Sequence, residues 1–368
     1  MIIAVGVLSL MFDNQNPSSH RTQLLDYGGV QPKHSEGKVK PSADIINFKI
    51  PRGWKKDQSR GNENIPRVYT FSGGSWLKSD ICKSYKSYLD DPNYFLTTSN
   101  SEAGAVKMFV HDPKYDAISG TIKQRHSFES ENVDFVISML RKDPQLSLID
   151  IGTNVGLYAM AAALLGRQVL AIDAVKQNIQ HVCASVEYQN FTNRVALIYN
   201  AVSDSNRKIN FRHGGNGDFG LSHVDADDIA SQMNSKFKNY FANGKTMALD
   251  AVTLDDIVQL PRLTFFRNIL IKMDVEGHEH RVLLGAKKFM KKKLKYIKGI
   301  IMEWQWFSGR QAENTILNLM AGWNFAPYRF HYKVDLLDKK DLKNWPSDVL
   351  WLPLITTKRN NATKSKTN

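Results

Sequence analysis

Short apolar runs alternate with segments of helical periodicity from Ser147 onward. Such runs are typical of parallel strands, whose two faces are both covered and therefore lack polar alternation. In chain order they predict strand, helix, strand, helix and strand at SLIDIG, VGLYAMAAALLG, QVLAID, VKQNIQHVCASVEYQ and RVALIYNAV. This alternation indicates a parallel sheet with helices on both faces.

A polar interval at residues 204–244 interrupts the alternation. It contains GGNGDFG, which predicts a hairpin or loop insertion near the open end of the sheet. Regular patterns then resume with the helix TLDDIV, the strand NILIKMDVEG, the helix HRVLLGAKKFM, the strand YIKGIIMEWQW, the helix AENTILNLM and strands near NFAPYRF and DVLWLPL. We expect one doubly wound α/β domain with about seven strands and no internal repeat.

The region before this domain has a different composition. Residues 13 to about 75 are rich in Pro, Gly, Ser, Asn, Lys and Gln, which predicts a mostly irregular stem. Helical and strand patterns return at WLKSDICKSYKSYL and KMFVHD as a lead-in. We therefore divide the chain into an apolar start and irregular stem (1–75), a lead-in (76–146), the main domain (147–356) and a polar basic tail (357–368).

The first residues, MIIAVGVLSLMF, are uncharged, and the chain turns polar at Asp13. A helix that spans a bilayer needs about 20 apolar residues, so this stretch does not span as it stands. It lacks the basic flank and the small-residue cleavage site of a signal peptide. A shortened membrane anchor and an ordinary apolar N-terminus both stay open.

The composition is that of a globular protein, because 42% of the 368 residues are hydrophobic. Lysine and arginine number 49 against 36 acidic residues, and the net charge of +13 favours anionic surroundings such as nucleic acid, lipid headgroups or acidic glycans. The run KKFMKKKLKYIK extends from Lys287 to Lys298. Its first interpretation is lysines that complement the dipole at a helix C-terminus, and its second is a platform for anionic partners or a membrane contact. No recognition motif accompanies the charge, so we expect no nucleic-acid partner.

The two cysteines, Cys82 and Cys183, lack the CxxC spacing of a zinc or redox site, and we expect buried thiols rather than a disulfide. Two N-x-S/T triplets, at Asn190 and Asn361, add slightly to the case for a secretory-pathway protein. A membrane-associated or luminal location is therefore slightly favoured over a cytoplasmic one.

The stretch DIGTNVG, residues 150–156, carries the first candidate chemistry. Dinucleotide sites use GxGxxG because the pyrophosphate sits against exposed backbone N–H groups. Here Gly152 and Gly156 lack the close glycine between them, and Asp150 would repel a diphosphate. The pattern disfavours a nicotinamide or nucleotide-sugar site and favours a cationic ligand without phosphate, S-adenosylmethionine.

The next two strand ends extend this site. Asp173 lies about twenty residues on, where a carboxylate can accept both ribose hydroxyls. The third strand ends at Asn200, whose amide is placed to read the adenine edge. An acid at one strand end is often only a helix cap, so the ordered set carries more weight than any single member.

A second constellation, DVEGHEH at residues 274–280, follows the strand NILIKM. Open α/β sheets bind substrates at this end of their strands. Methyl transfer from a sulfonium is an in-line displacement, so a hydroxyl acceptor must be aligned and must lose its proton. Asp274, Glu276 and His278 are the candidates for the base.

Other interpretations of this constellation stay open. A divalent metal held by Asp274 and a neighbouring acid would lower the pKa of the acceptor hydroxyl. HEH lacks the HExxH spacing of zinc proteases. The structural interpretation is that Glu276 and Glu279 favour the start of the following helix, while His280 is a solvated surface residue.

Glu303 lies at the end of the strand IIMEWQW, one strand later. Acids buried at strand ends are usually functional or paired. The flanking Trp304 and Trp306 suit a sugar or another flat acceptor.

Over about residues 147–310 the chain resembles the FkbM-type S-adenosylmethionine-dependent methyltransferases. The segments that carry the resemblance are, in order, DIGTNVG, AIDAVKQN, YNAVSD, LDAVTLDDI, IKMDVEGHEHRVLLGA and IIMEWQW. The resemblance implies the class I methyltransferase (Rossmann-like) fold, with its last strand antiparallel, and O-methylation of a hydroxyl. Many members have glutamate and proline where Asp173 and Ala174 stand here. The resemblance also implies site residues: Asp150, Gly152, Asn154, Gly156 and Asp173 line the cofactor, and Asp274 and Glu276 line the reaction side.

We therefore expect an O-methyltransferase of the EC 2.1.1 type that acts on a hydroxyl of a glycan, lipid or small metabolite. The alternative is a non-catalytic binding or scaffold protein that keeps the fold at a membrane. The sequence selects neither metal dependence nor an oligomeric state.

Overall fold

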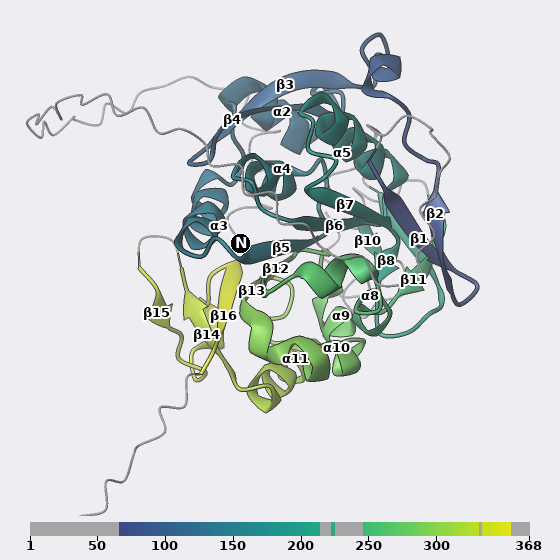
Figure 1. Ribbon diagram of the computed structural model, residues 1–368. Helices are drawn as coiled ribbons and strands as arrows, with labels where there is room; N and C mark the ends of the chain where they lie inside the picture. The colour runs from purple at the N-terminus through teal and green to yellow at the C-terminus, as the bar shows by residue number, and fades with distance from the viewer. Residues whose placement is uncertain (1–65, 214–221, 225–245, 331–332, 355–368) are drawn as a thin grey trace, which may run out of the picture. The chain divides into compact units, whose positions relative to one another are not determined.

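The structure is a computed structural model and describes residues 66–213, 222–224, 246–330 and 333–354 (Figure 1). The predictions for the apolar start, for GGNGDFG, for the tail and for Asn361 lie outside these ranges. Within them, no helix combines the length and the apolar character needed to cross a bilayer.

One sheet of ten strands has the order β15-β14-β16-β13-β12-β5-β6-β7-β1-β2. Its centre is parallel and consists of β5 (Leu146–Ile151), β6 (Val169–Asp173), β7 (Val195–Tyr199), β12 (Asn268–Met273) and β13 (Ile297–Glu303). Near one edge, β16 (Asp348–Pro353) lies antiparallel between β13 and β14 (Phe325–Arg329). The class I methyltransferase fold predicted from the sequence, with its reversed strand, is confirmed.

Three further strands extend the sheet beyond the predicted seven: β1 (Val68–Ser72), β2 (Ser75–Ser79) and β15 (Asp335–Leu336). β1 pairs parallel with β7, and Val68 and Phe71 are buried. The prediction of an irregular stem through residue 75 is therefore wrong from Val68 on. The strand is too short for a periodic pattern, and its place is decided by pairing with a distant strand.

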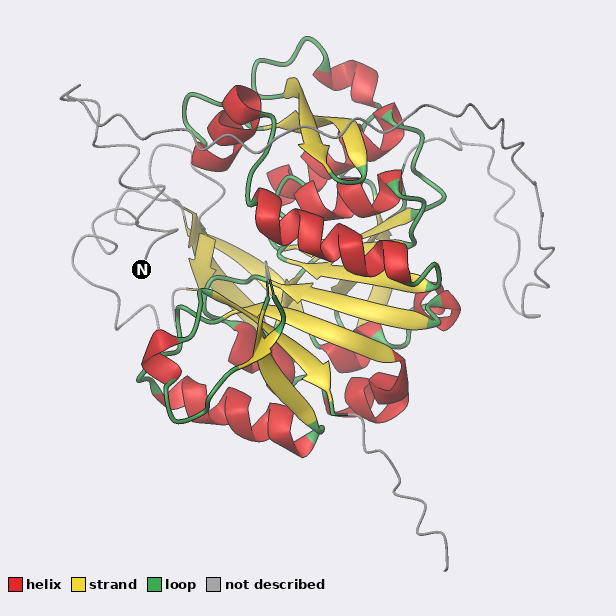
Figure 2. Cartoon of the chain, turned by 90° about the vertical axis from the view of Figure 1, so that its left-hand side faces the viewer, coloured by secondary structure: helices red, strands yellow, loops and turns green. Residues whose placement is uncertain are grey.

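Alternate residues of the central strands feed two hydrophobic cores, one on each face of the sheet. In β5, Ile149 and Ile151 join one core and Leu146 and Leu148 the other, as the two-residue period of a strand requires. Helices cover both faces (Figure 2). On the Leu148 side lie α3 (Ser130–Lys142), α4 (Leu157–Leu164) and α5 (Lys176–Tyr188); on the Ile149 side lie α8 (Leu254–Ile257), η3 (Pro261–Phe265), α9 (Glu279–Leu284), α10 (Lys287–Lys293) and α11 (Gln311–Gly322).

The lead-in and the polar interval both contain regular structure. A second sheet has four strands in the order β10-β9-β11-β8. Its strands β9 and β10 lie within the polar interval and pair antiparallel. The remaining elements are η1 (Tyr85–Tyr88), β3 (Phe95–Ser101), β4 (Gly104–Val110), α2 (Ala117–Arg125), β8 (Ala201–Val202), β9 (Lys208–His213), β10 (Ser222–Val224), β11 (Thr246–Val252), η4 (Leu294–Tyr296) and η5 (Leu342–Asn344).

A disulfide joins Cys82 to Cys183 of α5, with their Cα atoms 5.9 Å apart. The prediction of two free thiols is therefore wrong. The cysteines are separated by 101 positions in the sequence, so their spacing contains no signal for the pairing. The bond attaches the segment after β2 to the helix that follows Asp173.

Candidate active site

The glycine turn connects β5 to α4 at the carboxyl end of the sheet. Gly152 and Gly156 have φ angles of +80° and +88°, which L side chains rarely adopt. A Cβ on Gly152 would lie 1.7 Å from the carbonyl oxygen of Asp274. The Asp274 N–H also donates to the carbonyl oxygen of Ile151 at 2.9 Å. The glycine therefore allows the two predicted constellations to meet, although they lie far apart in the sequence.

Asp173 is bound to the same turn. Its Oδ2 accepts a hydrogen bond from the N–H of Asn154 at 2.8 Å. Its Oδ1 accepts from the N–H of Val175 at 2.7 Å and from Nδ2 of Asn178 at 3.2 Å. Burial raises the pKa of Asp173 to about 6, although these hydrogen bonds oppose the rise. A carboxylate offers about four lone-pair sites, so an acceptor position remains for ribose.

Asp150 is hydrogen-bonded to the glycine turn from the buried end of β5. It is fully buried, and its Oδ2 accepts a hydrogen bond from Oγ1 of Thr153 at 2.7 Å. Burial raises the pKa of its carboxyl, while the charge of Lys272 opposes the rise. Its Oδ1 has no hydrogen-bond partner within the described part of the chain. Direct contact of Asp150 with a cofactor stays a prediction.

Asn200 has a structural role. Its Oδ1 accepts from the N–H of Phe71 at 2.6 Å, and its Nδ2 donates to the carbonyl oxygens of Phe71 at 3.0 Å and Asp250 at 2.8 Å. The residue is 1% exposed. The predicted adenine contact is therefore wrong, because the amide already joins β1 to β11.

A buried lysine, Lys272 of β12, lies at the centre of the acidic site. Its Nζ is 2.9 Å from Oδ2 of Asp274 and 4.8 Å from the ring centroid of Tyr158. The Tyr158 hydroxyl donates to Oε2 of Glu129 at 2.6 Å. Burial alone would lower the pKa of Lys272, but the charges of Asp274, Asp150 and Glu129 raise it above its ordinary value. The ammonium group therefore stays charged.

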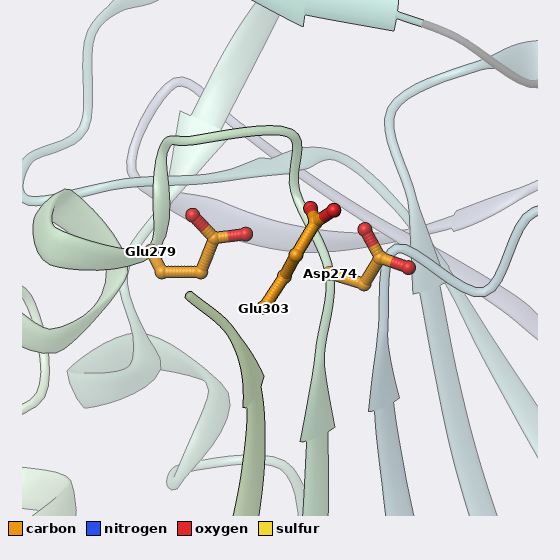
Figure 3. Close-up of side chains that lie close together, drawn as sticks. All are labelled: Asp274, Glu279 and Glu303. Atoms are coloured by element: carbon orange, nitrogen blue, oxygen red, sulfur yellow. The ribbon is translucent and has the colours of Figure 1, made fainter. Parts of the chain in front are cut away.

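Three carboxylates converge next to this lysine (Figure 3). Asp274 follows β12, Glu279 begins α9 and Glu303 ends β13, and an oxygen of each lies within 4.8 Å of the others. These residues form what we call the carboxylate triad. Parallel strands end at one edge of the sheet, so neighbouring β12 and β13 bring Asp274 and Glu303 together.

Hydrogen bonds orient two members of the triad. Oε1 of Glu279 accepts from the N–H of Val275 at 2.9 Å, whereas its Oε2 is buried without a hydrogen-bond partner among the described residues. Oε2 of Glu303 accepts from the indole N–H of Trp306 at 2.6 Å, and its Oε1 accepts from the Gln305 amide. Burial raises the pKa of Glu279 to about 8.

Glu276 lies in the turn beside the triad, with a φ of +54°. A left-handed backbone at a non-glycine residue is costly and is often found at functional sites. Burial, followed by the charges of Asp274 and Glu279, raises the pKa of Glu276 well above its usual range. Asp274, Glu276 and Glu303 therefore lie close enough to interact electrostatically, and their catalytic roles stay predictions.

Other predictions at this site are corrected. His278 is placed against Ser203, with its Nε2 2.9 Å from the hydroxyl oxygen, and is not a member of the triad. His280 is 8% exposed, so the prediction of a solvated surface residue is wrong. Glu279 is fully buried and belongs to the triad, so a place at the start of α9 is only part of its role. Trp304 packs against Trp345 at a centroid distance of 4.7 Å and is 1% exposed, so it belongs to the core rather than to an acceptor platform.

Four residues of this site were not predicted: Lys272, Tyr158, Glu129 and Asp348, the last of which lies opposite Glu303 in the β13–β16 pairing. Lys272 had a signal in the sequence, because a lysine inside the apolar strand NILIKM must find counter-charges. Asp348 also had one, since it opens the apolar run DVLWLPL. Glu129 reaches the site from the segment before α3, and nothing in its surrounding sequence indicates that placement.

Comparisons with known proteins identify a family and several similar solved structures. Residues 150–330 match the methyltransferase FkbM domain family. No curated protein sequence matches the chain. Similar solved structures include the O-methyltransferase from Bacillus cereus in complex with SAH, at 11% identity over 62% of this chain and 82% of that chain, with a TM-score of 0.34. Magnesium protoporphyrin IX methyltransferase from Synechocystis with bound SAM is 12% identical over 64% of this chain and 84% of that chain, with a TM-score of 0.31. Precorrin-6y C5,15-methyltransferase from Geobacter metallireducens is 10% identical over 60% of this chain and 86% of that chain, with a TM-score of 0.29.

The role of Asn200 is tested by Asn200→Ala. We expect the free energy of unfolding to fall by about 2–4 kcal/mol, because three hydrogen bonds are lost and buried backbone groups are left unpaired. Urea denaturation measures the loss, and the exposed Asn193→Ala is the control. Calorimetry should show unchanged affinity for S-adenosylhomocysteine. Unchanged stability with lost affinity would return Asn200 to the cofactor site.

The contact at Gly152 is tested against Gly166, whose φ of +85° is similar but whose added Cβ would meet nothing within 4 Å. Gly166→Ala should cost about 1–2 kcal/mol of stability from backbone strain alone. Gly152→Ala should cost about 3 kcal/mol or more and abolish S-adenosylhomocysteine binding, because the backbone of Asp274 must move. Equal losses in the two variants, measured by urea denaturation, would contradict the close contact.

Proposed function

We propose that this chain, an S-adenosylmethionine-dependent methyltransferase of the FkbM type, transfers the methyl group to a hydroxyl oxygen of its acceptor. One observation carries the proposal: carboxylates gather at the ends of β12 and β13, next to the glycine turn. A hydroxyl is a weak nucleophile until it gives up its proton, and carboxylates are suitable acceptors for that proton.

The residues around the glycine turn fit the cofactor. S-adenosylmethionine, when bound, supplies a methyl group on a cationic sulfonium. Asp173 retains an acceptor position for the ribose hydroxyls, and the turn beside it has no side chain at Gly152. The acids of the site outnumber Lys272, the cation among them, and a positively charged ligand would stabilise their ionised forms.

Glu276 is the proposed base. Asp274 is paired with Lys272, Glu279 with the Val275 N–H, and Glu303 with Trp306 and Gln305. By contrast, the Glu276 carboxylate accepts no hydrogen bond from the described residues, and it is therefore available to an incoming hydroxyl. In this scheme Asp274 and Lys272 are the nearby charges, and the ionised form of Glu276 accepts the proton as the oxygen–methyl bond forms. The raised pKa of Glu276 makes that ionised form a stronger base.

The acceptor is proposed to be a glycan, lipid or small metabolite that carries a hydroxyl. Burial of Trp304 removes the aromatic platform as an argument for a sugar. The acceptor class therefore rests on the proposed base alone and needs a direct experiment.

The full chain is incubated with methyl-labelled S-adenosylmethionine and fractionated glycan, lipid and small-metabolite pools. We expect the label in a methyl ether that survives alkali. Glu276→Gln should lower the transfer rate by about 100-fold or more, since a positioned base contributes at least that much. The exposed Glu102→Gln is the control. Label released as methanol by alkali would identify a carboxyl acceptor instead. Absence of transfer from every pool, with cofactor binding intact, would support the non-catalytic alternative.

The pKa of Asp173, raised by burial to about 6, predicts the pH dependence of cofactor binding. Protonation replaces an acceptor by a donor, so binding is lost as the pH falls through about 6. Calorimetry should show about tenfold weaker binding of S-adenosylhomocysteine at pH 5 than at pH 7. Asp173→Asn should bind weakly at both values with no such dependence. A wild-type affinity that is constant between pH 5 and 7 would refute the ribose contact.

A further inference from the structure

We propose that the carboxylate triad of Asp274, Glu279 and Glu303 binds one divalent cation of the oxygen-preferring class, such as magnesium, manganese or calcium. The proposal deepens the proposed function by adding a partner to the same site. The binding site itself rests on geometry, and only the role given to the cation rests on the proposed function.

The spacing of the triad suits such an ion. One carboxylate oxygen from each of its three residues lies within 4.8 Å of the other two. Ligands on opposite sides of an ion are separated by about 4.2 Å for magnesium and about 4.8 Å for calcium, because the two metals bind oxygen at about 2.1 Å and 2.4 Å. The three oxygens can therefore surround one ion with small side-chain movements.

An unsatisfied buried atom points to a ligand independently of the acidic composition. Glu279 is fully buried, and its Oε2 has no hydrogen-bond partner among the described residues. Buried polar atoms without a partner are rare, because the lost hydration costs free energy. Figure 3 shows this carboxylate turned toward Glu303 and Asp274. The vacant bonding capacity thus belongs to a carboxyl group that faces the triad.

The other oxygens of the triad are held by groups that keep the carboxylates in place. The Val275 N–H holds Glu279, the Trp306 indole and the Gln305 amide hold Glu303, and Lys272 holds Asp274. Such outer contacts orient ligands in established metal sites. The carboxylate oxygens of Glu303 retain lone pairs in addition to those used in these hydrogen bonds.

Charge balance favours a dication. The three carboxylates carry three negative charges when ionised, and Lys272 supplies one positive charge at 2.9 Å from Asp274. A divalent ion would bring the fully ionised set to neutrality. A cation here would hold an acceptor hydroxyl near Glu276 and ease the loss of its proton.

The test is calorimetric titration of the EDTA-treated full chain with magnesium, manganese and calcium chloride. We expect one equivalent of at least one of these ions to bind and to raise the melting temperature. Glu279→Gln should weaken binding at least tenfold while the protein stays folded. Glu313→Gln is the matched control, because Glu313 is also largely buried and also accepts a backbone N–H four residues earlier, from Gly309, but lies outside the triad.

The outcomes separate the cation site from the proposed function. Absence of binding for all three ions, or equal binding by wild type and Glu279→Gln, would overturn the cation site. Methyl transfer to a hydroxyl that persists in EDTA together with absent ion binding would overturn the cation site alone. Ion binding that depends on Glu279, with no hydroxyl methylation under any condition, would support the site and count against the proposed function.

Discussion

The parallel pairing of β5 with β12 fixes the whole active-site edge. Its register sets Asp150 opposite Lys272 and Ile151 opposite Met273. The next residue, Asp274, bonds back to Ile151, and its carbonyl oxygen occupies the space that a side chain at position 152 would need. This backbone contact therefore positions the glycine turn against the segment that carries Asp274. A shift of one residue would turn the side chains of the strand to the opposite face and separate the two constellations.

The same pairing explains why a charged lysine is buried in a central strand. Lys272 is 6% exposed, and desolvation of an ammonium group is costly unless it is paired. Asp274, Asp150 and Glu129 supply the compensating charges from three parts of the chain. Stability and chemistry are coupled here, because Asp274 compensates the charge of Lys272 and also belongs to the carboxylate triad. A cationic methyl donor or a divalent ion would stabilise the ionised forms of these acids.

The sequence predicted the frame of the site well, because strand ends and glycine turns are local signals. Asp150, Gly152, Asp173, Asp274 and Glu303 all lie at the predicted edge. The errors concern partners that only tertiary structure supplies. The amide of Asn200 is taken up by β1, Trp304 is covered by Trp345, and Cys82 meets Cys183 across 101 positions. Asp348 lies opposite Glu303 in the β13–β16 pairing, and Glu129 accepts from the Tyr158 hydroxyl, but no motif connects either segment with the triad.

If the glycine turn and the carboxylate triad form one methyl-transfer site, a crystal structure of the full chain with S-adenosylhomocysteine will show it. We expect ribose hydroxyls within hydrogen-bond distance of the Asp173 carboxylate and a sulfur atom that faces Asp274 and Glu303. A ligand bound away from the β5–β12 edge, or with its sulfur turned away from the triad, would show that the turn and the triad do not form one site.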